Sequence, residues 1–387
     1  MHILEIPSFF PPYGGEFCLD QAKALKALGH EVRILSHVQL GATIGLKDYL
    51  LLPYRRYEYQ RDGITVYQSY QRGLPKMVHH NVKHWISIVE SMFSDYVAKY
   101  GRPDILHAHC AKWAGYASMK IAKQYGVPYV ITEHLPLMLL REEFGDDLSK
   151  AWQIPLLRKA YEEANMVVPV SEELVEDTSY YYGADYRWQF ISNTIDTDFF
   201  HYESRQPRRG RSFRFCCVAD YHYRKGYDVL FEAFRLLQAR GFDVELVVAG
   251  LHTDGYACKT AIGNRLLNGV KTYGRIDREG IRKLLYDSDA FVLASRSEVQ
   301  PLVLLEAMST GIPVVSTECT PKSLRIRECC IIVPVNDIVS LADAMEKIME
   351  APVIDGQALS NQIRALASPA VVGKKLSKLF SSVIASV

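Results

Sequence analysis

Short apolar runs alternate with longer amphipathic stretches along the first half of the chain. The runs have the length of strands, and the stretches repeat their apolar positions at the helical period. The predicted strands are residues 2–7, 31–36, 104–109, 127–134 and 166–171, and the predicted helices are 19–30, 112–126 and 150–164. Strand, helix, strand repetition at this spacing predicts a parallel sheet with helices on both faces.

A polar, basic stretch at residues 201–212 interrupts this alternation and has the composition of a linker. The alternation restarts at FRFCCVA (213–219) and continues to IPVVST (312–317). We therefore predict an α/β chain with two Rossmann-like, doubly wound domains, residues 1–198 and 199–369. Such domains face one another across a cleft and bind ligands at the carboxyl ends of their strands.

Residues 40–85 are less regular than their surroundings. LPYRRYEYQRDG at residues 52–63 is interpreted as a hairpin or loop. PKMVHHNVKHW at residues 75–85 is interpreted as the beginning of a helix.

The 387 residues have a formal net charge of +1, which argues against a nucleic-acid binder because such domains are strongly basic. The eight cysteines include two adjacent pairs in apolar runs and no CxxC spacing, which favours a reducing cytoplasm. Because the sequence has no apolar window of about 18 residues, we expect a cytoplasmic protein. A peripheral contact with the inner face of the membrane stays open.

Two short motifs have the chemistry of an anion site. Gly14 and Gly15 follow the first strand and open a helix, so that the backbone can approach a ligand closely. Arg224 and Lys225 precede a glycine that begins another helix, and such cations suit a diphosphate. The alternatives are an ordinary glycine turn and a solvated first helical turn.

Glu298 and Glu306 lie eight positions apart across a strand end, a loop and a helix. At the carboxyl end of its strand, Glu298 is directed at a bound sugar. Glu306 can accept two hydrogen bonds from the vicinal diol of a ribose, while amides from about residue 299 to 304 bind a phosphate. The alternative is a pair of surface glutamates beside an amphipathic helix.

Histidines form three candidate groups. His134 ends a strand of the first domain at the expected ligand edge, although a lone histidine is more often structural. His107 and His109 alternate on a strand, and His80 and His84 have helical spacing. No third ligand is evident beside either pair, so no metal site is expected.

Ten fragments, in order, resemble the GT-B-fold retaining glycosyltransferases of family 4, and the resemblance covers nearly the whole chain. The fragments are PPYGGEFCLDQAKALKALGHEV, PDILHAH, GVPYVITEH, VVPVSEEL, FISNTIDTDFF, RKGYDVLFEAF, LVVAG, VKTYGRI, SDAFVLASRSE and LLEAMSTGIPVVST. The resemblance implies an acceptor-binding first domain, to which a helix at 370–387 crosses back, and a second domain that binds the nucleotide sugar.

The resemblance also implies residue roles. Its catalytic set is Glu298 at the transferred sugar, His134 at a hexose hydroxyl and Lys225 at the diphosphate. Its donor-binding set is Gly14, Gly15, Arg224, Lys225, Tyr273, Gly274, Arg275, Val299, Gln300, Pro301, Leu302 and Glu306. Tyr273 to Arg275 stand where the family's backbone holds the nucleobase, and Glu306 stands where it binds the ribose.

The sequence departs from the family pattern at several positions. The arginine that usually precedes the lysine by five or six residues is replaced by Ala219 and Asp220, so Arg224 is its candidate substitute. Other departures are Asn193-Thr194, Pro301 and Thr320-Pro321. These changes affect the assignment of the donor more than the assignment of the fold.

The expected reaction is transfer of a hexosyl unit from UDP- or GDP-hexose, with retention, to a hydroxyl of a saccharide or lipid-linked saccharide in surface polysaccharide synthesis. The resemblance implies no metal and no other cofactor, since cations and helix amides stabilise the leaving diphosphate. The expected acceptor or membrane face comprises Arg55, Arg56, Lys83 and Trp85. The alternatives are a sugar-nucleotide epimerase of the same fold and a degenerate nucleotide-binding module.

Overall fold

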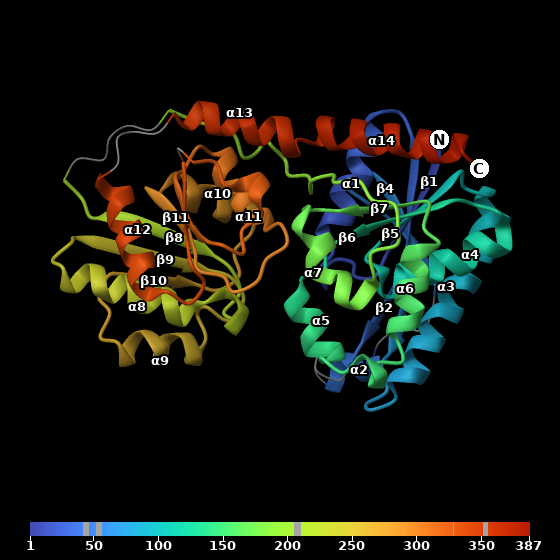
Figure 1. The fold of residues 1–387 in the computed structure, drawn as a ribbon, viewed down its shortest axis with the longest axis horizontal. Coiled ribbons are helices and arrows are strands. Elements are labelled where there is room, and N and C mark those ends of the chain that lie inside the picture. Colours follow the sequence, from blue (N-terminus) through green and yellow to red (C-terminus); the bar gives the residue numbers. More distant parts are fainter. Residues whose placement is uncertain (42–45, 52–55, 205–209, 328, 351–354) are drawn as a thin grey trace. The chain divides into compact units, whose positions relative to one another are not determined.

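The computed structural model describes residues 1–41, 46–51, 56–204, 210–327, 329–350 and 355–387 (Figure 1). By internal contacts the chain divides into two compact units. Unit 1 comprises Met1–Thr194 and Pro369–Val387, and unit 2 comprises Ile195–Ser368. Each unit is described by itself below.

Unit 1 is built on one mostly parallel sheet. Its described strands are β1 (His2–Pro7), β2 (Glu31–Leu40), β3 (Tyr57–Arg61), β4 (Ile64–Arg72), β5 (Ile105–His109), β6 (Tyr129–Glu133) and β7 (Met166–Pro169). Their order is β3-β4-β2-β1-β5-β6-β7, and only β3 pairs antiparallel, with β4. Strand β2 pairs with one side of β1, and β5, which comes later in the chain, pairs with the other side. The strand order therefore reverses between β1 and β5.

Helices cover both faces of this sheet. The helices are α1 (Glu16–Ala27), α2 (Leu46–Leu51), α3 (Val78–Tyr100), the π-helical turn η2 (Ala111–Gly115), α4 (Tyr116–Tyr125), α5 (Leu137–Phe144), the 3-10 turn η3 (Leu148–Lys150), α6 (Ile154–Glu162), α7 (Glu173–Tyr182) and α14 (Pro369–Ala385). One core lies between the sheet and α3, α4 and α6. The other lies under α1 and α14, which run side by side although they stand at opposite ends of the chain (Figure 1).

Unit 2 repeats this plan with a parallel sheet in the order β10-β9-β8-β11-β12-β13. Its strands are β8 (Phe213–Val218), β9 (Val244–Ala249), β10 (Val270–Tyr273), β11 (Ala290–Leu293), β12 (Val314–Thr317) and β13 (Cys330–Val333). Its helices are η4 (Tyr223–Lys225), α8 (Tyr227–Ala239), α9 (Tyr256–Asn264), α10 (Arg278–Tyr286), α11 (Leu302–Ser309), η5 (Lys322–Leu324), α12 (Ile338–Glu350) and α13 (Gly356–Ala367). The strand order reverses between β8 and β11.

The predicted class, α/β with two doubly wound parallel sheets, is confirmed. The hairpin interpretation is correct, because β3 and β4 pair antiparallel around Asp62 and Gly63, and the predicted helix begins at Val78. The helix expected at 150–164 is shorter, since α6 spans Ile154–Glu162 and a separate 3-10 turn precedes it. Within the described ranges, no helix has both the length and the apolar character needed to cross a bilayer.

Replacement of Phe380 by alanine tests how far unit 1 depends on its C-terminal helix. Phe380 is fully buried under the sheet and lies edge-on to the ring of His107, so the truncation removes a large apolar side chain from the core. We expect unit 1 to lose about 3–5 kcal/mol of unfolding free energy.

The measurement is urea unfolding followed by tryptophan fluorescence. All four tryptophans, at positions 85, 113, 152 and 188, belong to unit 1, so their emission reports this unit alone. The matched control is Lys378→Ala at an exposed position of the same helix, which should shift the stability by less than about 0.5 kcal/mol. Equal midpoints for the two variants would contradict the role given to α14.

Candidate active site

The strand reversal in unit 2 brings together two loops that are far apart in the sequence. β8 and β11 are neighbours, and the loops that follow them carry the turn η4 and Glu298. Open parallel sheets bind ligands at this position because the loops diverge there and leave room between them. The predicted residues Arg224, Lys225 and Glu298 therefore meet at one edge of the sheet.

The carboxylate of Glu298 is almost fully buried, with 5% of its side chain exposed. Lys225 Nζ lies 2.5 Å from Oε1, and Arg224 Nη1 lies 3.3 Å from Oε2. The Ser295 hydroxyl donates a third hydrogen bond, of 2.7 Å, to Oε1. Two cations and a hydroxyl thus contact the carboxylate and fix its orientation.

The turn that carries both cations is held against the sheet by a close backbone contact. Gly226 has φ +66°, and a Cβ atom there would lie 1.9 Å from the Ala294 carbonyl oxygen at the end of β11. Arg296 adds a second restraint, since it forms a bidentate ion pair with Asp228 and donates to the Tyr223 carbonyl. These contacts fix Arg224 and Lys225 beside Glu298.

The loop after Glu298 leads into α11, which carries the second predicted glutamate. Val299, Gln300 and Pro301 are buried, whereas Leu302 and Glu306 are partly exposed. Two features correct the predicted amide cluster. Pro301 has no amide hydrogen, and the Leu304 amide donates to the Pro301 carbonyl, 3.1 Å away, as a normal first-turn bond.

The predicted nucleobase segment follows β10. Tyr273 is 51% exposed and Arg275 is exposed, whereas the Gly274 carbonyl accepts a 3.0 Å bond from the Gly250 amide. Asp220, which replaces a family cation, accepts the Leu251 amide at 2.8 Å. In this chain that position fixes the loop after β9, and the local positive charge comes from Arg224 and Lys225.

In unit 1 the predicted glycines shape the loop between β1 and α1. A Cβ atom on Gly15, which has φ +82°, would lie 2.0 Å from the Phe9 carbonyl oxygen, whereas one on Gly14 would meet no atom within 4 Å. The tight turn at Gly15 directs α1 so that Phe17 stacks on the ring of His134, with centroids 3.6 Å apart. The glycine loop and His134 are therefore connected through Phe17.

His134 is partly exposed, and the buried carboxylate of Glu133 fixes its backbone. Glu133 Oε1 accepts the amides of His134 and Leu135, both at 2.9 Å, and Oε2 accepts the Tyr161 hydroxyl at 2.8 Å. Burial, reinforced by His109 and His107, lowers the pKa of His134 well below its ordinary value, and the Asn193 side chain opposes this shift. His134 is accordingly a neutral imidazole at pH 7.

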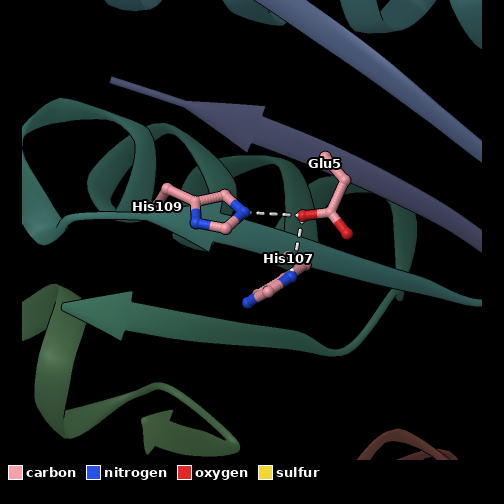
Figure 2. Close-up of side chains that lie close together, drawn as sticks. All are labelled: Glu5, His107 and His109. Atoms are coloured by element: carbon pink, nitrogen blue, oxygen red, sulfur yellow. Dashed lines mark hydrogen bonds and ion pairs between the residues drawn. The ribbon is translucent and has the colours of Figure 1, made fainter. Parts of the chain in front are cut away.

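A carboxylate joins the two strand histidines at the strand reversal of unit 1 (Figure 2). Glu5 Oε2 lies 2.7 Å from His107 Nδ1 and 2.8 Å from His109 Nε2, and all three side chains are fully buried. The expectation that no third ligand lies beside this pair is wrong, because Glu5, the register partner of His107 on β1, contacts both rings. His80 and His84 stack at 5.8 Å, and of the described residues only Glu5, His107 and His109 form a group of three with metal-ligand spacing.

The predicted acceptor face needs correction. Trp85 is buried, with 3% exposed, and its indole donates to the His37 carbonyl at 2.9 Å, so it lies on no surface, although it lines the cavity described next. Arg56 is paired with Asp95 and hydrogen-bonds to Ser91, and Lys83 is exposed. Arg55 lies outside the described residues.

A cavity of about 290 Å³, which Trp85 helps to line, lies at the carboxyl edge of the unit 1 sheet. Its lining residues come from the ends of β1 and β2, the start of α3 and the loop after β5. They include Phe9, Tyr13, Leu40, Val78, Lys112, Trp113 and Glu143. Lys112 and Glu143 form an ion pair, which places both signs of charge beside aromatic side chains.

Three charged residues of these sites were missed at the sequence level. Glu5 and Glu133 each interrupt an apolar strand, and a charge inside such a strand is rarely buried without partners, so that pattern was an available signal. Arg296 had no comparable signal because its partners, Asp228 and the Tyr223 carbonyl, lie far away in the sequence.

Comparisons with known proteins bear on the family. A model described as Glycosyltransferase Family 4 matches residues 14–199, and one described as Glycosyl transferases group 1 matches residues 212–351. A Bacillus subtilis (strain 168) protein named for teichuronic acid biosynthesis, TuaC, is 27% identical over 337 residues, which span 82% of this chain and 81% of the relative.

Two solved structures show the shared fold. Sucrose-phosphate synthase from Thermosynechococcus elongatus has a TM-score of 0.79 at 16% identity, with 100% of both chains covered. Anabaena HepE in complex with UDP and glucose has a TM-score of 0.73 at 18% identity, with 99% of this chain and 100% of that chain covered. The chain belongs to the family 4 glycosyltransferases and has the GT-B fold.

Proposed function

We propose that the protein transfers a hexosyl unit, with retention and without a metal ion, from a nucleotide diphosphate sugar to a hydroxyl of a saccharide or lipid-linked saccharide. The observation that carries this proposal is the carboxylate of Glu298 between Lys225 and Arg224 at the strand reversal of unit 2. A transferase of this kind needs cations for the leaving diphosphate and a fixed carboxylate near the sugar. Both occur there within one set of contacts.

In this proposal Lys225 and Arg224 neutralise the diphosphate. A guanidinium and an ammonium together match phosphate oxygens in charge and in hydrogen-bond donors. They supply the electrostatic stabilisation that a divalent cation supplies elsewhere. The complex of HepE with UDP and glucose, on the same fold, supports a nucleotide sugar as the donor.

Glu298 is assigned to orient the sugar and to stabilise positive charge on its ring. Two cations and the Ser295 hydroxyl share its carboxylate, and such contacts withdraw the electron density that a covalent nucleophile requires. The leaving phosphate then takes the acceptor proton on the same face of the sugar, which gives retention. Glu306 binds the ribose diol, and His134 contacts a hexose hydroxyl.

The acceptor is assigned to the cavity of unit 1. Trp113 offers an aromatic surface for a sugar ring, and the Lys112–Glu143 pair offers polar groups for its hydroxyls. The nearby helix α2 is tied to the end of β4, because Arg72 Nε donates to the Tyr49 carbonyl at 2.8 Å.

The hydrogen bond between Arg72 and Tyr49 places exposed apolar residues of α2 close to the cavity. Leu50 and Leu51 are 58% and 69% exposed, and the segment after β4 adds Leu74, Met77 and Val78, which are also exposed. Such a rim is suited to a bilayer surface, and a lipid carrier would then present the saccharide to the cavity. The name of TuaC, which refers to teichuronic acid biosynthesis, supports a surface polysaccharide as the product.

Glu306→Ala tests the donor site. Loss of a charged hydrogen-bond acceptor costs roughly 1.5–3 kcal/mol, so the affinity for the preferred nucleoside diphosphate should fall about tenfold to a hundredfold. Calorimetric titration with UDP, GDP, ADP and dTDP, each with and without EDTA, measures this change. EDTA should leave the affinity of the wild-type protein unchanged.

The matched control is Glu279→Ala, at an exposed position in the first turn of α10 in the same unit. This control should bind nucleotide like the wild-type protein. An unaltered affinity in Glu306→Ala would remove the ribose role. Release of a free altered sugar without any acceptor would identify an epimerase, and binding without turnover would identify a degenerate module.

The double variant Leu50→Ser and Leu51→Ser tests the membrane rim. Each substitution removes exposed apolar area that would otherwise enter the bilayer at about 25 cal/mol per Å², so the variant should bind liposomes several-fold more weakly. Sedimentation with liposomes that contain anionic lipid, at low and high salt, gives the measurement. Nucleotide affinity should not change, because neither leucine belongs to the donor-binding set.

Leu266→Ser supplies the control, since Leu266 is 85% exposed in unit 2 and is remote in sequence from the rim. This variant should sediment with liposomes like the wild-type protein. If the wild-type protein stays in the supernatant at low salt, the lipid-linked acceptor is withdrawn and a soluble saccharide takes its place.

A further inference from the structure

We propose that Glu5 and His109 are positioning residues that fix the tautomer of His134, with the hydrogen on Nε2 and a bare Nδ1 as hydrogen-bond acceptor. The inference rests on the proposed function, because it concerns the histidine assigned to the sugar. One line of contacts runs from Thr132 on β6 through His107 to Glu5 on β1, and returns through His109 to His134 after β6. Figure 2 shows the centre of this line.

The position of Glu5 determines where the hydrogens lie on both strand histidines. Burial alone would raise the pKa of Glu5, but the charges and hydrogen bonds of His107 and His109 outweigh it and lower the pKa to about 2. The ionised carboxylate is only an acceptor. A ring nitrogen 2.7 or 2.8 Å from its oxygen must therefore carry a hydrogen, so His109 has its hydrogen on Nε2.

The position of the hydrogen on His109 determines which nitrogen of His134 carries a hydrogen. Burial and the charge of His107 lower the pKa of His109 to about 4, against the opposing contact with Glu5, so His109 is neutral at pH 7. A neutral imidazole with its hydrogen on Nε2 has a bare Nδ1. His109 Nδ1 lies 3.4 Å from His134 Nε2, at the long end of the hydrogen-bond range, and the hydrogen of this bond must come from His134.

At the other end of the line of contacts, His107 is held by its packing and by a hydrogen bond to Thr132. The Thr132 hydroxyl lies 2.6 Å from His107 Nε2, and the His107 ring packs edge-on against Phe380 of α14. Phe17 covers the ring of His134 from α1. The ring of His134 is thus fixed by stacking and its hydrogen by Glu5, which leaves Nδ1, a buried atom without a hydrogen-bond partner among the described residues, as the acceptor.

A metal ion explains this geometry less well. Glu5 Oε2 lies directly against both ring nitrogens, at 2.7 and 2.8 Å. A zinc ion needs about 2.0–2.1 Å to each imidazole nitrogen and about as much to a carboxylate oxygen, with the nitrogen lone pairs directed at the metal. His109 instead directs Nε2 at this oxygen as a hydrogen-bond donor does, and His107 Nδ1 lies at the distance of an ion pair.

The variant pair Glu5→Met and Glu5→Gln tests the inference. Methionine has a similar size but no carboxylate to accept a hydrogen bond. The hydrogen of His109 can then lie on either ring nitrogen. Glutamine can place its amide oxygen where Oε2 lies and accept the hydrogen of His109, because Oε2 makes that bond and Oε1 has no hydrogen-bond partner. Glutamine should therefore rescue function although it carries no charge.

The first measurement is nitrogen-15 NMR of histidine-labelled full-length protein, with the His134 signals assigned by His134→Gln. We expect the Nε2–H tautomer of His134 in the wild-type protein and in Glu5→Gln, and a mixture in Glu5→Met. This readout needs no donor, so it remains valid if the proposed function fails. A Nδ1–H tautomer or an imidazolium in the wild-type protein would overturn the inference even if no variant folds.

The second measurement is the steady-state rate of sugar transfer. In Glu5→Met, kcat should fall about tenfold or more, the kinetic equivalent of one lost hydrogen bond, while KM for the donor changes less than about twofold. Glu5→Gln should stay within about threefold of wild type by the same scale. The stability control is Tyr129→Phe, which loses a buried bond to the Ala160 carbonyl at the opposite end of β6.

Three kinetic or binding results would overturn the inference. Glu5→Gln could be as slow as Glu5→Met, which would make the charge, and not the tautomer, decisive. Glu5→Met could be no slower than Tyr129→Phe at equal loss of melting temperature, which would reduce Glu5 to a structural role. EDTA could lower the melting temperature of the wild-type protein and not that of Glu5→Met, which would identify a metal site.

Discussion

The ion pairs of Glu298 are the interaction on which the candidate donor site depends. A carboxylate with 5% exposure is stable as an anion only if nearby cations and donors replace its lost hydration. Lys225, Arg224 and Ser295 do so, and removal of one cation from such a group typically costs about 3–5 kcal/mol. The arrangement of the loops after β8 and β11 is therefore coupled to the charge of the site, and Arg296 and Gly226 hold the turn in the position that this charge requires.

Unit 1 also contains a buried carboxylate at its strand reversal, but groups of a different kind contact it. This carboxylate is that of Glu5, and its partners are two imidazoles. Glu133, on the neighbouring strand β6, is satisfied by backbone amides and a tyrosine hydroxyl. Both carboxylates organise the end of the sheet while His134, which is only partly exposed, remains neutral, because burial and neighbouring rings lower its pKa.

Much of the fold follows from periodicity, and the site follows in part. Alternating strands and helices predicted both sheets, and residues 52–63 were interpreted as a hairpin or loop, of which the hairpin is found. The convergence of Arg224, Lys225 and Glu298 was predicted because residues after parallel strands meet at one edge. Helix α9 was not predicted, since it buries only Cys258 and so has little apolar periodicity. Trp85 was assigned to a surface because cations surround it in the sequence, whereas its helix turns it into the core.

The contrast between the two units matches the two ends of a nucleotide sugar. In the proposed function the diphosphate carries negative charge, and unit 2 supplies two cations for it, Lys225 and Arg224. A hexose is neutral, so a charged histidine beside it would lose hydration without gaining an ionic partner. Holding His134 neutral, with one hydrogen in a defined place, avoids that cost and leaves a directional acceptor. The buried line from Glu5 to His134 is therefore what a sugar-facing site requires, whereas cations are what a phosphate-facing site requires.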